Sequence, residues 1–123
     1  MKTNDPAIYH MCRKEEWTAA EQAGSYGGSS QDAADGFIHF SSAAQVVKSA
    51  AKHRAGQDGL VLLRVDPQRL GEALKWEESR GGHLFPHLYG ALPVEAVIAA
   101  YDVSLGADGR HVFPSELNLV EVE

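Results

Sequence analysis

The stretch DGFIHFSSAAQVV, residues 35–47, decides how the first half of the chain is interpreted. Its apolar run, Gly36–Phe40, is typical of a short strand and carries His39 near its end. The two serines that follow are typical helix N-caps, and the alanine-rich pattern after them predicts a helix to about Arg54. A strand therefore runs directly into a helix. His39 is either a buried histidine with a satisfied hydrogen bond or a residue that faces a ligand.

Further elements are expected on both sides of this stretch. The patterns predict a helix at 14–23, which Gly24 ends, and strands at 7–12, 60–65, 74–78 and from about 97 to 103. GADGR, residues 106–110, is a hairpin turn signal, and the tail at 118–123 predicts an edge strand. Residues 21–35 and 79–90 are expected to be loops, the second leading into a short extended segment.

This order of elements predicts one α+β domain spanning residues 1–123. Two main helices lie in the N-terminal half and mostly strands follow, which argues against a doubly wound α/β sheet. The length of 123 residues suits one domain with one core, and no repeat or linker interrupts it. We expect a globular chain from its 44% hydrophobic and 23% charged residues.

Charge and cysteine content narrow the classes of partner. The net charge is −6 and no Lys/Arg cluster is present, so no nucleic-acid partner is expected. The single cysteine, Cys12, excludes an internal disulfide and favours a cytoplasmic location. The N-terminus MKTNDPAIYH has no apolar segment typical of a signal peptide. No apolar run approaches the roughly 20 residues that span a bilayer, so no membrane partner is expected.

Six histidines raise the question of a metal site, which the sequence does not favour. His83 and His87 are four residues apart and would share one face of a helix. Pro86 and the glycines at 81–82 argue against a helix there, and no second cysteine is available. We therefore predict no metal site.

Three kinds of chemistry remain open for the polar residues. His10 and Cys12 share one face of a strand, as do His39 and Ser41, which suits nucleophilic catalysis, although Cys12 also fits a small core residue. Ser41 and Ser42 at a helix start would attract an anion, but a plain capped helix fits equally well. A glutamate at a strand edge, such as Glu77, could orient a ribose hydroxyl or act as a base.

Five motifs together resemble a small bacterial family, domain of unknown function 952: IYHMC, GFIHFSS, LVLLRVDPQRL, KWEES and LFPHLYGALPVEAV. The resemblance spans residues 7 to about 103. It implies an ADP-ribosyltransferase-like split fold, in which two small packed, mostly antiparallel sheets surround a cleft for NAD or a related nucleotide.

RNA 2'-phosphotransferases of that superfamily have similar motifs in the same order. The resemblance places His10 at their cleft histidine, His39 and Ser41 at a histidine and serine of the second motif, and Glu95 at a glutamate of the third. The chain differs at residues 11–12, which are Met-Cys in place of Gly-Thr, and it has no basic RNA-binding lobe.

The functional hypothesis is a cleft for a small nucleotide- or NAD-like molecule, in an ADP-ribosyltransferase-like group-transfer enzyme. Its catalytic candidates are His10, His39, Glu77 and Glu95. Its ligand-binding candidates are Ser41, Ser42, His87 and Tyr89. Two alternatives stay open, a non-catalytic binding module for a small anionic metabolite and a structural protein whose histidines make core hydrogen bonds.

Overall fold

The computed structural model describes residues 6–79, 82–117 and 119, and it confirms the α+β class. The helices are α1 (Lys14–Ala23), α2 (Ser30–Asp35) and α3 (Val46–His53). The strands are β1 (Ile8–Arg13), β2 (Ser25–Tyr26), β3 (Ile38–His39), β4 (Ser41–Ser42), β5 (Leu60–Val65), β6 (Leu74–Glu78), β7 (Leu84–Leu88), β8 (Leu92–Pro93), β9 (Val97–Leu105) and β10 (His111–Val112). Short 3-10 turns lie at Pro67–Arg69, Gly71–Ala73, Val94–Ala96 and Ser115–Leu117.

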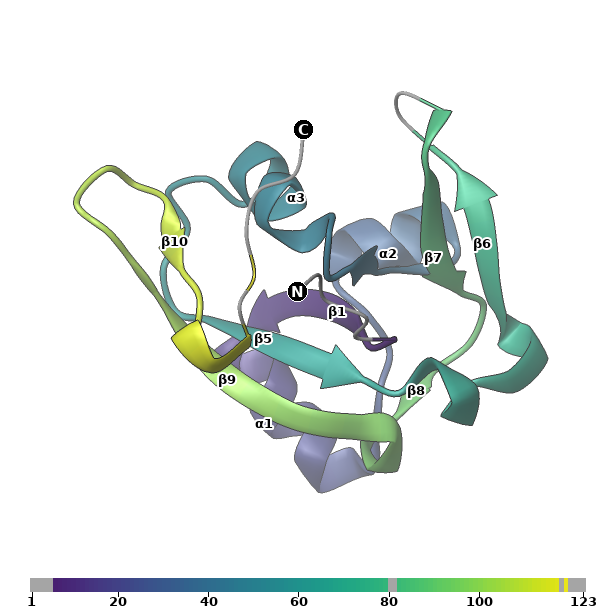
Figure 1. Cartoon of the computed structure of the whole chain (residues 1–123). Coiled ribbons are helices and arrows are strands. Elements are labelled where there is room, and N and C mark those ends of the chain that lie inside the picture. Colours follow the sequence, from purple (N-terminus) through teal and green to yellow (C-terminus); the bar gives the residue numbers. More distant parts are fainter. Residues whose placement is uncertain (1–5, 80–81, 118, 120–123) are drawn as a thin grey trace.

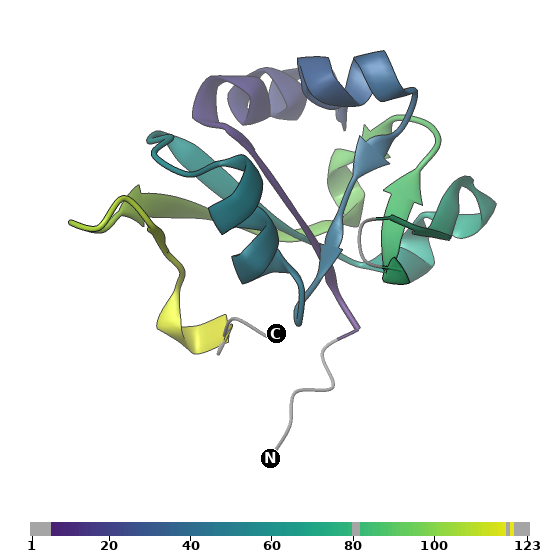
Figure 2. The same ribbon diagram turned by 90° about the horizontal axis from the view of Figure 1, so that it is seen from above.

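The strands form antiparallel sheets of different size. A five-stranded sheet has the order β10-β9-β5-β1-β4, and a three-stranded sheet has the order β3-β7-β6. A two-stranded ladder joins β2 to β8. Figure 1 shows the β6–β7 hairpin standing apart from the larger sheet, with α2 and α3 lying above β1. Seen from above, α1 and α2 lie along one side of the molecule (Figure 2).

The stretch at residues 37–42 connects the two main sheets. Ile38 and His39 pair with β7, whereas Ser41 and Ser42 pair with β1. Between the two pairs, Phe40 is buried and its N–H donates to the Pro86 carbonyl at 2.9 Å. One continuous strand segment therefore changes sheets, which brings β1 and β7 to the two sides of His39.

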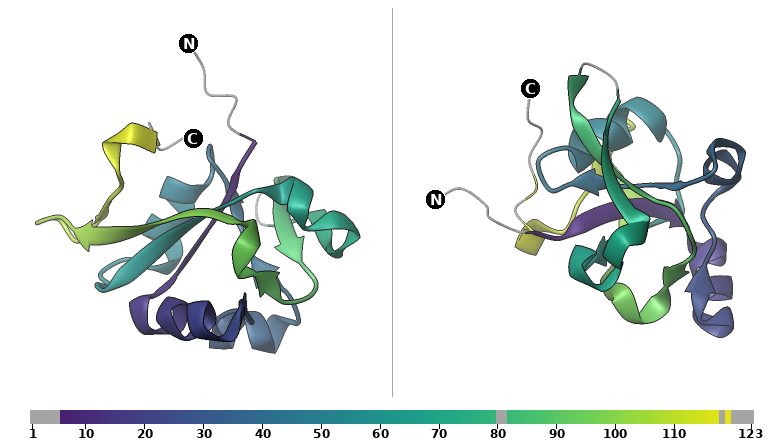
Figure 3. Two further views of the ribbon diagram at one scale, coloured as in Figure 1. Left: turned by 90° about the horizontal axis from the view of Figure 1, so that it is seen from below. Right: turned by 90° about the vertical axis from the view of Figure 1, so that its right-hand side faces the viewer.

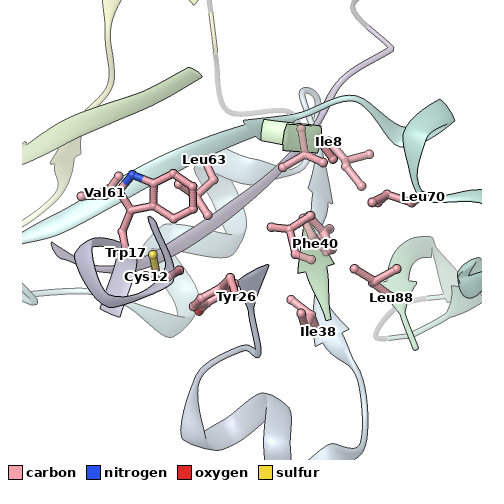
Figure 4. Packing of buried hydrophobic residues seen from close by; sticks show 14 residues of the cluster. Ile8, Cys12, Trp17, Tyr26, Ile38, Phe40, Val61, Leu63, Leu70 and Leu88 are labelled. Carbon is pink, nitrogen blue, oxygen red and sulfur yellow. The ribbon is translucent and has the colours of Figure 1, made fainter. Parts of the chain in front are cut away.

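The core lies on both faces of the five-stranded sheet, as the period-two alternation of a strand requires. On one face Ile8 and Cys12 of β1 pack with Trp17 of α1 and with residues of the smaller sheet (Figure 4). On the other face the alternate residues of β1 pack against α3. Full burial of a large aliphatic side chain is worth about 1.5–3 kcal/mol, so these two contacts fix both helices to the sheet.

Three local predictions are wrong. The helix expected from Ser41–Ser42 begins at Val46, because Ser41 pairs with Tyr9 and the Ser42 N–H donates to the Gln45 side chain. Sheet pairing thus overrides the capping preference of the serines. The region at 21–35 is no loop but contains β2 and α2, and the region at 79–90 contains β7. The tail at 118–123 lies outside the described residues except for 119.

Candidate functional site

A cleft of about 760 Å³ opens between α2 and α3. Residues of β1, of the β3–β4 segment and of β7 complete its walls. Figure 2 shows the chain leaving α2 toward the smaller sheet, while α3 packs over the larger one. The histidines expected at a site, His10, His39 and His87, all line this cleft.

Asp32 of α2 is the buried charge of the site, with only 3% of its surface exposed. Its carboxylate accepts hydrogen bonds from the N–H of Ser29 at 2.8 Å and from the N–H of His39 at 3.1 Å. It also accepts one from the His39 ring, whose Nδ1 lies 2.5 Å from the carboxylate oxygen. Burial alone would raise the pKa of Asp32. The hydrogen bonds from the His39 ring and from the two backbone N–H groups outweigh it and lower the pKa to about 2.

His39 stands between two carboxylates. Its Nδ1 contacts Asp32, and its Nε2 lies 3.0 Å from Asp35, while 40% of the side chain stays exposed. The hydrogen bond to Asp32 raises the pKa of His39, and burial opposes that rise. The arrangement favours the imidazolium form at the cleft surface.

His10 is buried, and its surroundings favour the neutral imidazole. Its Nδ1 lies 2.6 Å from the His39 carbonyl oxygen, which can only accept, so Nδ1 carries the proton. The other nitrogen, Nε2, then accepts from the Tyr26 hydroxyl at 2.8 Å. Burial lowers the pKa of His10, although Asp32 at 3.8 Å opposes this. The two adjacent histidines are thus pushed toward opposite protonation states.

A second histidine–carboxylate pair lies on the smaller sheet. His87 is buried, and its Nδ1 lies 2.7 Å from Oε1 of Glu77, which also accepts from the Tyr89 hydroxyl at 2.7 Å. The hydrogen bond from His87 is the main cause of the lowered pKa of Glu77. The ring of Phe37 stacks on that of His87, with 4.2 Å between the ring centroids, and its centroid lies 4.6 Å from that of His39. Phe37 therefore contacts both histidine–carboxylate pairs.

The wall opposite Asp32 carries positive charge. Arg54 follows α3, donates to the Met11 carbonyl at 2.9 Å and to Gln57 at 3.1 Å, and lines the cleft beside His53. Carboxylates on α2 therefore face an arginine across the cleft. Such a division suits a ligand that has hydroxyls at one end and an anionic group at the other.

The structure brings together most of the residues expected at a site. Ser41 lines the cleft with the three histidines, and Glu77 and Tyr89 connect to it through His87. Glu77 and Tyr89 themselves lie outside the cleft lining, as do Ser42 and Glu95, and Glu95 is exposed on a 3-10 turn.

One candidate side chain lies in the core, and three residues that line the cleft were not predicted as site residues from the sequence. Cys12 is a core residue, and burial raises the pKa of its thiol to about 12, which disfavours a thiolate nucleophile. Asp32, Asp35 and Arg54 are missing from the sequence-based site. The pattern Ser29-x-x-Asp32 is a capping-box signal that marks the start of α2.

Two further findings concern metals and membranes. Over residues 6–79, 82–117 and 119, no group of three His, Cys, Asp or Glu side chains is placed to hold a metal ion. Within that same part of the chain, no helix has the length and apolarity that a membrane crossing requires.

Fold and site define a small α+β protein with a cleft lined by histidines and acidic residues. The family described as protein of unknown function DUF952 matches residues 11–100, and the chain belongs to this family. The predicted family membership is therefore confirmed. No curated protein matches the chain.

Solved structures of one bacterial protein share the fold. The crystal structure of protein CC0527 from Caulobacter crescentus is 48% identical, with a TM-score of 0.87 over 92% of this chain and 99% of that one. The solution structure of CC0527 is 49% identical, with a TM-score of 0.77 over 86% of this chain and 91% of that one.

Proposed function

We propose that the cleft binds a nucleotide- or NAD-like ligand and that the protein is a group-transfer enzyme of ADP-ribosyltransferase-like type. One observation carries the proposal: a neutral, buried His10 and a His39 that favours its charged form meet in the wall of a cleft of about 760 Å³. Neighbouring groups whose environments push their pKa values apart are a common mark of acid–base sites. Pockets of roughly 300–1,000 Å³ hold ligands of nucleotide size.

The charges of the cleft walls indicate which end of such a ligand each wall would bind. Asp35 is partly exposed beside His39, and carboxylates of this kind accept hydrogen bonds from ribose hydroxyls. On the opposite wall, Arg54 suits a phosphate, because a guanidinium binds phosphate oxygens in a bidentate manner. His10 orients His39 through the backbone carbonyl rather than contacting ligand with a ring nitrogen, since both nitrogens are engaged.

Group transfer from an NAD-like donor would proceed at the ribose. The bond between ribose C1' and nicotinamide breaks, and nicotinamide leaves with the electron pair. A hydroxyl-bearing acceptor forms the new bond at C1' and loses its proton to a base. The sugar is cationic in the transition state, so nearby carboxylates stabilise it electrostatically. Asp35 fits this role by position, whereas Glu95 lies outside the cleft.

A second candidate function is a binding module without turnover. Both nitrogens of His39 already contact carboxylates, and this observation favours a fixed, charge-compensated wall over a proton carrier. The same cleft would then recognise a small anionic metabolite through Arg54.

A ligand screen tests both candidates. NAD, ADP-ribose, AMP and inorganic phosphate are each added in a thermal-shift assay, since a ligand that binds only the folded state raises the melting temperature. His39→Gln should abolish the shift, whereas His83→Gln, an exposed histidine outside the cleft lining, should retain it. Nicotinamide release from NAD then separates the enzyme from the binding module. Absence of any shift with all four probes would overturn the proposed ligand class.

A further inference from the structure

The outer strand of the three-stranded sheet has an open edge. β6 has β7 as its neighbour in the sheet order β3-β7-β6, and its other side meets no strand in the described part of the chain. Figure 1 shows β6 at the right-hand rim, and the right panel of Figure 3 turns this rim toward the viewer. A five-residue edge of this kind is a template for a further strand.

The hydrogen bonds that flank the hairpin fix which residues of β6 point outward. The N–H of Tyr89 donates to the Ala73 carbonyl at 2.8 Å, and the N–H of Ser79 donates to the His83 carbonyl at 2.9 Å. Bonded and non-bonded pairs alternate along an antiparallel ladder. The odd-numbered residues of β6 therefore carry the bonds to β7.

The even-numbered residues consequently face the open edge. Trp76 lies opposite Pro86, which has no N–H and whose carbonyl accepts from the other side of β7. The backbone N–H and C=O groups of Trp76, and by the same alternation those of Leu74 and Glu78, point away from β7. These groups are in position to form hydrogen bonds with a strand of another molecule.

We propose that two copies of this chain pair through β6, antiparallel, about a two-fold axis at Trp76. Trp76 then exchanges both backbone hydrogen bonds with Trp76 of the partner subunit, and the two sheets join into one of six strands. In this register Lys75 lies opposite Glu77 of the partner subunit, and by symmetry the contact occurs twice. The two residues form a non-bonded pair, in which side chains come closest, with Cα atoms about 4.5 Å apart.

Charge selects this register over its neighbours. A slip of two residues in one direction places Lys75 opposite Lys75 of the partner subunit. A slip in the other direction places Glu77 opposite Glu77 of the partner subunit. Like charges directly opposite each other destabilise a strand pair, whereas opposite charges stabilise it. The strand is therefore complementary to itself in one alignment.

Exposed apolar surface supports the same pairing. Trp76 is 47% exposed and Leu84 is 53% exposed, and their pairing partners place them on the same face of the hairpin. Aromatic residues are enriched at interfaces between proteins. The pairing also brings Lys75 of the partner subunit to Glu77, the carboxylate that holds His87 at the cleft wall.

Sedimentation of the full chain over about 1–300 µM tests the proposal. An edge-strand contact is smaller than the roughly 1,600 Å² of a standard interface, so the dimer should dissociate at micromolar concentrations. The monomer has a mass of 13.3 kDa, and the dimer has twice that. Trp76→Pro removes an outward N–H and leaves the β7 ladder intact, so it should give a folded monomer. Lys75→Glu should raise the dissociation constant about tenfold.

A disulfide at the axis identifies the face that is used. Residues in a bonded antiparallel pair lie about 5.5 Å apart at Cα, within disulfide range. Trp76→Cys should therefore form a covalent dimer on oxidation, whereas Ile98→Cys, exposed on β9, should not. A wild-type monomer at every concentration would overturn the proposal. So would a dimer that survives Trp76→Pro, or one cross-linked through residue 98.

Discussion

Replacement of Asp32 by asparagine should destabilise the protein by about 2–3 kcal/mol and should do so in a pH-dependent way. The side chain is almost fully buried, and it accepts hydrogen bonds from Ser29 and from both the backbone and the ring of His39. Asparagine keeps the size but loses the charge. It also places an N–H₂ group, which cannot accept, where a carboxylate oxygen accepts hydrogen bonds.

The magnitude follows from the pKa of Asp32. Folding lowers it from 3.8 to about 2, and each factor of ten in proton affinity is worth about 1.4 kcal/mol, which gives about 2–3 kcal/mol. With an unfolding entropy of about 2.1 cal/mol/K per residue over 123 residues, the melting temperature should fall by about 10 °C.

The sign of the pH dependence is fixed by both partners. Asp32 has a lowered pKa in the folded protein, so its contribution to the free energy of unfolding is present above pH 3.8 and is lost as the pH falls toward 2. His39 has a raised pKa, so its contribution is present below pH 6.5 and is lost as the pH rises through the folded value. Both describe one ion pair and are not added. The difference between wild type and Asp32→Asn should be largest between about pH 4 and pH 6.5.

Urea unfolding followed by Trp17 fluorescence measures this difference, because Trp17 lies in the core. Asp102→Asn is a suitable control, since Asp102 forms an exposed ion pair with Lys14 and its loss should change the free energy of unfolding little. The reasoning fails if Asp32→Asn costs less than about 0.5 kcal/mol. It also fails if the cost is equal at pH 2.5 and pH 5.5.

Three further outcomes are expected. Gly28→Ala should lower the free energy of unfolding in urea by more than about 1 kcal/mol, because the φ of Gly28 is +95° and an added Cβ would lie 2.8 Å from the Cβ of Asp32. Gly27→Ala, where an added Cβ meets open space, should change this free energy little, and equal losses in the two variants would contradict the reasoning. Cys12 should resist a thiol reagent at pH 8 until urea unfolds the chain, since burial raises its pKa to about 12; rapid labelling of the native protein would disprove the buried assignment. Ser42→Ala should leave thermal stability almost unchanged, because the helix begins at Val46; a loss of about 1 kcal/mol would indicate a capping role after all.

Elements with strong local patterns could be predicted from the sequence. The helix at 14–23 is present with the expected bounds, and Gly24 ends it with a φ of +89°. The strands at 60–65 and 74–78 also agree with the structure. In each case the residues that determine the element lie within it, so periodicity and capping are sufficient.

The region around α2 could not be predicted from hydrophobicity, because its decisive buried residue is charged. Over Ser30–Asp35 the one buried side chain is Asp32, and the rest of the helix faces solvent or the cleft rim. A buried aspartate is stable only with partners, and the ring of His39 comes from the following strand. The Ser29 capping signal was available, but it identifies a helix start and not a site.

The two serines after Phe40 show the opposite error, in which a valid local signal is overridden. Their capping preference is real, yet the strand continues because Phe40 bonds to β7 and Ser41 pairs with β1. Long-range pairing supplies backbone hydrogen bonds that a cap would otherwise provide. Only the tertiary arrangement decides between the two.

His39 connects the separate parts of the site and makes them interdependent. Its carbonyl accepts from His10, its ring binds Asp32 and Asp35, and its ring also lies 5.5 Å from that of His87. A ligand that binds Asp35 would therefore change the charge balance on His39 and, through the chain, the position of its carbonyl. Because that carbonyl fixes the tautomer of His10, the protonation of His10 should respond to a ligand that it does not touch. Histidine ring NMR with and without ADP-ribose would detect this response, and an unchanged His10 beside a shifted His39 would refute the coupling.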